Sequence, residues 1–117
     1  MRGSGSYHAG RVAEDSVARL YAGFGQEILA RRWRGSAGEI DLIVRDGAEV
    51  IFIEVKKSKT HAMAAEHLTS RQMGRIYQAA SEFIGSEPAG QDTLVRFDVA
   101  LVDSVGRIEI LQNAFAA

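Results

Sequence analysis

The chain has 117 residues, of which 46% are hydrophobic and 25% are charged. This length fits one globular domain, which buries roughly 65% of the surface that the unfolded chain exposes. The net charge of −1 argues against a grip on nucleic acid through bulk charge, no apolar run approaches the roughly 18 residues of a membrane span, and the absence of cysteine excludes disulfides and thiolate zinc sites.

The N-terminal segment lacks the apolar stretch of a signal peptide, so we expect a cytoplasmic protein. Residues 1–8 are expected to be a disordered leader, and residues 9–117 to form the single domain. A helix is predicted from about 9 to 23, ended by Gly23 and Gly25. Its apolar stripe, at spacings of three and four, consists of Ala13, Val17, Leu20, Tyr21 and Phe24.

A strand is predicted for residues 26–34, followed by a hairpin with strands at 39–45 and 48–57. Asp46-Gly47 is a preferred pair for a two-residue type I′ turn, so Arg45 should pair with Ala48 and Asp41 with Phe52. Opposed residues share a face, and side chains repeat with a period of two. Asp41, Glu54 and Lys56 should therefore lie on one face, whereas a loop of odd length would send Asp41 to the other.

The opposite face of the last hairpin strand is fully apolar at Ile51, Ile53 and Val55, so it should meet the core. After a polar connection, a second helix is predicted from 70 to 84, with Thr69 as N-cap and Gln72 completing a capping box. Its buried stripe comprises Met73, Ile76, Tyr77, Ala80, Phe83 and Ile84. Strands at 94–102 and 107–111 follow. The order of one helix, three strands, one helix and two strands predicts an α/β sandwich with a central mixed sheet of about five strands.

Four segments of the sequence are together typical of one family. They are Gly38-Glu-Ile-Asp41-Leu-Ile, Phe52-Ile-Glu54-Val-Lys56, Arg96-Phe97-Asp98-Val99 and Asn113-Ala-Phe115. In order and spacing they resemble the small bacterial YraN-like proteins of the UPF0102 family, over nearly the whole chain. By fold, that family is similar to the restriction-endonuclease-like nucleases with the PD-(D/E)XK signature, which include archaeal Holliday-junction resolvases.

The resemblance implies a metal-dependent endonuclease, with DNA a more natural substrate than RNA, and a homodimer, since related resolvases act in pairs. It implies Asp41, Glu54 and Lys56 as catalytic residues, and adds the Val55 carbonyl and Glu14 to the two carboxylates as metal ligands. Ile40 stands where the signature has proline. The chemistry of the residues agrees, because carboxylate oxygens suit Mg²⁺ or Mn²⁺ and a lysine can offset charge on a phosphoryl transition state.

Basic residues are concentrated around this hairpin: residues 31–75 hold nine Lys or Arg and six Asp or Glu, whereas residues 76–117 hold two and six. Such groups suit phosphate contacts, and they equally suit a solvated surface. The candidate nucleic-acid contacts are Arg34, Lys57, Lys59, Arg71 and Arg75.

Two alternatives to a nuclease stay open: a catalytically silent nucleic-acid-binding module with the nuclease fold, and an adaptor that docks a protein through a sheet edge or the Phe115 tail. Several other features favour structural roles. We expect Arg96 and Asp98 to form an ion pair, Trp33 to pack in the core or at an interface, and His61 and His67 to lie in a loop.

Overall fold

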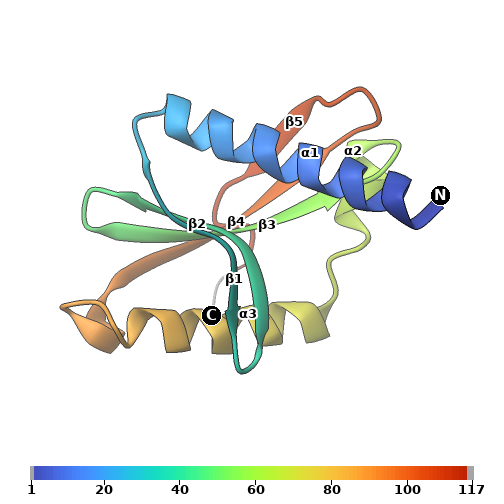
Figure 1. The fold of residues 1–117 in the computed structure, drawn as a ribbon. Helices are drawn as coiled ribbons and strands as arrows, with labels where there is room; N and C mark the ends of the chain where they lie inside the picture. Colours follow the sequence, from blue (N-terminus) through green and yellow to red (C-terminus); the bar gives the residue numbers. More distant parts are fainter. Residues whose placement is uncertain (1, 116–117) are drawn as a thin grey trace.

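A five-stranded sheet separates two helices, α1 (Arg2–Gly23) on one face and α3 (Ser70–Ile84) on the other (Figure 1). The computed structural model describes the backbone of residues 2–115 and the side chains of residues 10–115. The arrangement confirms the predicted α/β sandwich. No helix among the described residues is long and apolar enough to cross a membrane.

The strands lie in the sheet in the order in which they occur in the chain, and only β3 and β4 pair in parallel. The connection between them therefore crosses one face of the sheet, and it contains α3. The strands are β1 (Glu27–Gly35), β2 (Gly38–Asp46), β3 (Glu49–Lys57), β4 (Leu94–Val102) and β5 (Ile108–Leu111).

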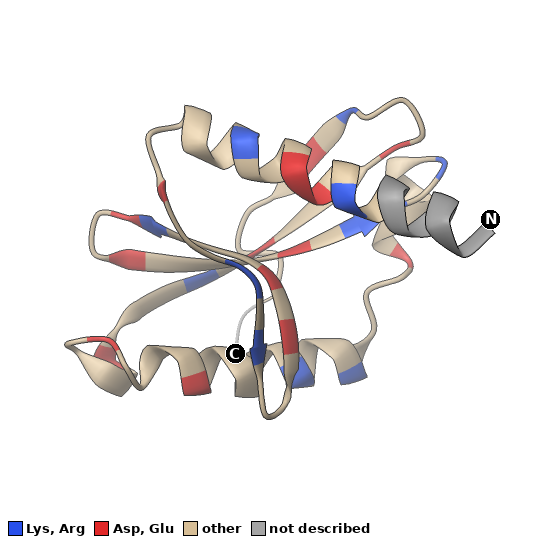
Figure 2. Ribbon diagram, viewed as in Figure 1, with Lys and Arg blue, Asp and Glu red and all other residues tan. Residues whose placement is uncertain are grey.

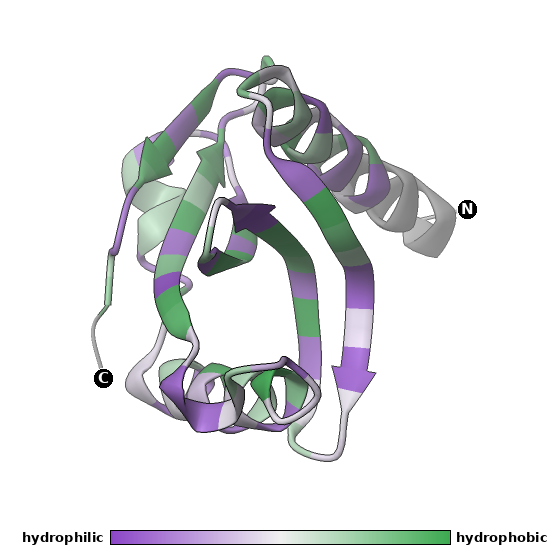
Figure 3. Cartoon of the chain, turned by 90° about the vertical axis from the view of Figure 1, so that its left-hand side faces the viewer, coloured by the Kyte–Doolittle hydropathy of each residue, from purple (hydrophilic) through white to green (hydrophobic). Residues whose placement is uncertain are grey.

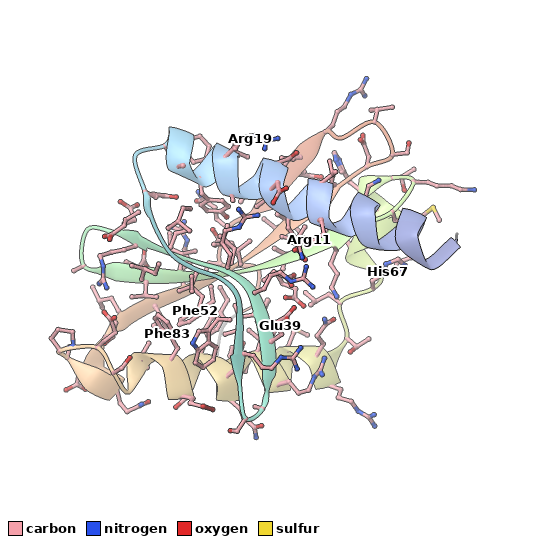
Figure 4. The ribbon with its side chains drawn as sticks, viewed as in Figure 1. Arg11, Arg19, Glu39, Phe52, His67 and Phe83 are labelled. Carbon is pink, nitrogen blue, oxygen red and sulfur yellow. The ribbon has the colours of Figure 1, made fainter. Side chains whose placement is uncertain are left out.

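Two apolar clusters fill the two faces of the sheet because residues of a central strand alternate between them. Phe52 faces α3, where it stacks on Phe97 and meets the edge of Phe83 at 5.9 Å between ring centroids (Figure 4). Ile51 and Ile53 face α1, and Val55 packs at the margin of the same cluster, as predicted. Figure 3 shows the hydrophobic stretches of the strands interrupted by hydrophilic bands.

The β2–β3 hairpin has a register two residues away from the predicted one. Asp46 pairs with Glu49, so the turn is Gly47-Ala48, and only Gly47 has positive φ, at 63°. Positive φ at the first central position alone is the requirement of a type II′ turn. The expected pairing of Asp41 with Phe52 is therefore wrong. The last pair of the ladder is Leu42 with Ile53, and Asp41 and Glu54 are the residues that follow it on the two strands.

The β1–β2 hairpin leaves the plane of the sheet and packs on α3 (Figure 1). Its register shifts between Ile28 and Ala30, and Arg32 has a positive φ of 54°, a conformation that is uncommon outside glycine. Trp33 then meets Phe83 edge-on at 5.4 Å, which confirms its expected place in the core. The pairing of β2 with β3 ends at Leu42, where the two strands separate.

Helix α1 differs from expectation at both ends. The backbone of α1 begins at Arg2, earlier than predicted; the disordered leader stays a prediction, and Met1 lies outside the described residues. Phe24 is not part of the buried stripe: it is 62% exposed, because α1 ends at Gly23 and the chain turns at Gly25 with a φ of 83°.

His61 does not lie in a loop but begins a short helix, α2 (His61–Ala65), whose N-cap is Thr60. His67 follows this helix in a turn. A single 3-10 turn (Gly90–Asp92) precedes β4. Helix α3 has the predicted bounds, and Thr69 caps it by accepting a hydrogen bond from the Gln72 backbone.

A buried carboxylate joins three parts of the chain on the α1 face. Asp98, which is fully buried, accepts hydrogen bonds from the Tyr21 hydroxyl at 2.7 Å, from the Arg96 guanidinium and from the Asn113 backbone. The expected Arg96–Asp98 ion pair is thus confirmed. On the other face Phe115 packs against Tyr77 and Phe97 and is 8% exposed, so it belongs to the core rather than to a free docking tail.

Candidate active site

A polar cleft of about 270 Å³ opens where β2 and β3 separate, between α1 and the first turns of α3. It lies at the carboxyl end of β3, which pairs in parallel with β4, and ligands commonly bind at this end of such strands. The lining residues are Glu14, Gly38, Glu39, Asp41, Glu54, Val55, Lys56, Gln72, Arg75 and Ile76. Figure 2 shows that the segments around it carry both acidic and basic residues.

Asp41 occupies the gap between the separated strands. Its Oδ2 atom accepts a hydrogen bond of 2.8 Å from the backbone N–H of Val55, which β2 no longer satisfies through its own backbone. In an antiparallel ladder, the N–H and C=O groups of one residue face the same neighbouring strand. The Val55 carbonyl therefore faces this gap as well, on the side where Asp41 lies.

Glu54 lies beside Asp41 and is almost fully buried, with 6% of its surface exposed. Its Oε2 atom accepts a hydrogen bond of 2.6 Å from Gln72 Nε2 and lies 3.6 Å from Lys56 Nζ. Its Oε1 atom is buried and has no hydrogen-bond partner among the described residues. Burial, and next the negative charge of Asp41, raise the pKa of Glu54 to about 8 against the opposing effect of Lys56.

Glu14 reaches the same cleft from α1. It forms an ion pair with Arg32, with 3.6 Å between Oε1 and Nη1. Burial and then the charge of Asp41 raise the pKa of Glu14 above its usual value, although Arg32 opposes that rise. Glu14 thus lies close enough to Asp41 for their charges to interact, and its own carboxylate forms an ion pair with Arg32.

The donor set fits a hard divalent cation with few protein ligands. Two neighbouring carboxylates and one backbone carbonyl face a single gap, and the unpartnered Oε1 of Glu54 is a buried acceptor that needs a proton, a water or an ion. No three His, Cys, Asp or Glu side chains in residues 10–115 converge into a metal cluster. Mg²⁺ tolerates so small a set because it usually retains several waters.

The structure brings all the predicted catalytic residues into the cleft, but only one of the predicted nucleic-acid contacts. Asp41, Glu54 and Lys56 all line the cleft, and so do Val55, Glu14 and Arg75. The other predicted contacts do not. Arg71 and Lys59 are exposed elsewhere, Arg34 bonds to Glu39 at the strand edge, and Lys57 lines a separate apolar pocket beside α1. Lys57 is there because neighbouring strand residues face opposite sides of the sheet.

Two cleft residues were not expected. Gln72 was interpreted as part of a capping box, but its side chain bonds to Glu54 across the cleft. Its position four residues before the buried Ile76 puts it on the face of α3 that adjoins the sheet, but the capping-box pattern accounts for the same residue. Glu39, labelled in Figure 4, lies two residues before Asp41 and so shares its side of β2. That period-two pattern was visible in the sequence.

Fold and cleft together define an α/β domain with a carboxylate-lined site at the end of its parallel strand pair. Residues 13–102 match the family described as "Uncharacterised protein family UPF0102". A UPF0102 protein of Cereibacter sphaeroides is 68% identical over 117 residues, the whole of both chains, and one of Ruegeria pomeroyi is 56% identical over 97% of this chain and 93% of its own. The chain belongs to the UPF0102 family.

Proposed function

We propose that this protein is a divalent-metal-dependent nuclease that hydrolyses phosphodiester bonds within DNA or RNA, with DNA the expected substrate. The observation that carries the proposal is the pair of neighbouring carboxylates in the cleft, Asp41 and Glu54, with one buried oxygen of Glu54 left without a partner. The resemblance of the site sequence to the PD-(D/E)XK nucleases supports it.

Asp41, Glu54 and the Val55 carbonyl would hold Mg²⁺ or Mn²⁺, with Glu14 joining them on release from Arg32. The bound ion supplies Lewis acidity and an acidified water. Lys56 carries a positive charge 3.6 Å from Glu54, so it can stabilise negative charge that develops on a phosphoryl group in the cleft. Arg75, exposed at the rim of the cleft on α3, would contact a neighbouring phosphate.

The proposal is tested with supercoiled, single-stranded and four-way-junction DNA incubated with Mn²⁺. We expect the wild-type protein to cut at least one of these substrates, and Asp41→Ala and Glu54→Ala to lose activity. Asp46→Ala, at the exposed end of the same strand, is the matched control and should keep it. Activity that survives in both site variants would refute the assignment.

The same preparations separate the nuclease from a silent binding module. A protein that binds DNA in a salt-sensitive manner, but takes up no Mn²⁺ and cuts nothing, would be the binding module instead. The dimer implied by the family resemblance is measured on the same samples by sedimentation, with and without a four-way junction.

A further inference from the structure

Gln72 holds one oxygen of the buried Glu54 carboxylate, and it is the only neutral side chain in residues 10–115 that donates a hydrogen bond to that carboxylate. The bond from Gln72 Nε2 to Glu54 Oε2 is 2.6 Å long and connects the first turn of α3 to β3. The backbone N–H of Gln72 is itself fixed by the Thr69 hydroxyl. The side chain thus starts from an anchored position rather than from a frayed helix end.

The two partners of Glu54 do different things. Lys56 supplies positive charge 3.6 Å from Oε2. Gln72 donates a hydrogen bond that fixes the orientation of the carboxylate but does not neutralise its charge. The terminal torsion of a glutamate is broad and roughly two-fold, so an unheld carboxylate can turn and offer either oxygen or both. Gln72 and Lys56 both engage Oε2, so Oε1 is the oxygen left without a partner.

From this geometry we propose that Gln72 is a positioning residue that restricts Glu54 to binding the metal through Oε1 alone. The inference rests on the proposed function, because it requires a divalent ion in the cleft. It gives a reason for a neutral amide at this place: a second cation would weaken the attraction of the site for a metal, and another carboxylate could not donate to Glu54 while ionised.

The test is calorimetric titration of Mn²⁺ into the wild-type protein and the variants Gln72→Met, Gln72→Asn and Asp41→Asn. Gln72→Met has nearly the same length but no donor, and Gln72→Asn keeps the amide but falls short. Loss of a partner that orients a metal ligand typically weakens metal affinity about 10- to 100-fold. We expect a loss of this size for both Gln72 variants. Gln78→Met, on the exposed side of the same helix, is the control and should bind as the wild type does.

Infrared difference spectra of Mg²⁺-loaded and metal-free protein provide a readout that a merely structural role would not move. We expect the separation between the antisymmetric and symmetric carboxylate stretches to be that of one-oxygen binding in the wild type. In Gln72→Met it should narrow toward that of two-oxygen binding, because Oε2 is released.

The outcomes are distinguishable. Wild-type Mn²⁺ affinity in both Gln72 variants, together with loss of binding in Asp41→Asn, would overturn the role of Gln72 and leave the metal site standing. Weaker Mn²⁺ affinity in Gln72→Met with unchanged infrared carboxylate bands would also overturn the role of Gln72, because the substitution would then act on the stability of α3 and not on the way Glu54 binds the metal. A wild-type protein that binds no Mn²⁺ would remove both the proposed function and this inference.

Discussion

At the scale of single residues, the most unusual feature is a carboxyl group that the fold holds in an unfavourable place. Glu54 is buried beside Asp41 and has one cation, Lys56, within 4 Å in the described part of the chain. Its pKa of about 8 means that the folded, metal-free protein keeps a proton there that the unfolded chain loses near pH 4.5. A divalent ion would replace that proton.

We therefore expect Glu54→Gln to stabilise the metal-free protein at alkaline pH. Because the pKa of Glu54 is raised on folding, the unfolded state binds fewer protons between about pH 4.5 and 8, and stability falls as pH rises through that window. The glutamine variant lacks this loss. Urea unfolding in EDTA should show a gain on the order of 2–4 kcal/mol at pH 8 that disappears near pH 4. Equal stability of the wild type and Glu54→Gln at pH 8 would contradict the raised pKa of Glu54.

Asp98 is the opposite case, a buried carboxylate whose partners are all present. Replacing it by alanine would leave the Tyr21 hydroxyl and the Arg96 guanidinium without their main acceptor in the sheet. We expect Asp98→Ala to lower the free energy of unfolding by about 3–5 kcal/mol, measured by urea titration. Asp92→Ala, at an exposed aspartate, should change it little; a similar small effect at Asp98 would show that the network contributes little.

At the scale of elements, the sequence predicts most strands and α3 to within one or two residues, because their apolar periods are clear and Thr69 marks a helix start. It could not give the hairpin register. A shift of two leaves every side chain on its own face, so the apolar residues of β2 and β3 fit both registers equally well. Asp-Gly suggests one turn, but the chain adopts the turn with Gly47 as its first central residue.

The bend of the β1–β2 hairpin could not be predicted from the sequence either. It depends on the positive φ of Arg32, a residue with no preference for that conformation, and on docking of the hairpin end onto α3. The predicted site residues still met in the cleft because their shared face required only a loop of even length. Gln72 was missed because a capping residue and a residue that crosses to the sheet have the same local pattern.

Two glycines test how tightly the bent hairpin is packed. A Cβ atom on Gly35 would lie 2.7 Å from the Trp33 ring, whereas one on Gly74, in α3, would meet nothing within 4 Å. We expect Gly35→Ala to destabilise the protein by about 1–3 kcal/mol. Gly74→Ala should stabilise it by about 0.5–1 kcal/mol, because alanine loses less backbone freedom in a helix. Thermal and urea unfolding check both; stabilisation by Gly35→Ala would show that the hairpin end is loosely held.

At the scale of the whole molecule, the near-zero net charge conceals an acidic cleft. Four Asp or Glu and two Lys or Arg line it, while the segments around the cleft carry other Lys and Arg (Figure 2). A polyanion is therefore repelled at the centre and attracted at the periphery unless a divalent ion reverses the balance.

This arrangement predicts that removing one cleft charge strengthens nucleic-acid binding when no metal is present. Fluorescence anisotropy in EDTA, at constant ionic strength, should give a lower Kd for Asp41→Asn than for the wild type. A change on the order of 1 kcal/mol, about fivefold, is expected for one charge near a phosphate. Asp46→Asn, remote from the cleft, is the control. Weaker binding by Asp41→Asn would mean that phosphates do not approach this site.

Nine of the ten residues around the cleft belong to positions 38–76, a third of the chain, and Glu14 alone comes from outside them. The chemistry is thus encoded in one uninterrupted stretch, and the remainder acts as a frame. Additions far from that stretch, for instance a peptide spliced into the β4–β5 turn at Ser104, have no reason to disturb the reactive groups. The molecule can accordingly gain new surfaces for partners while its centre stays as it is.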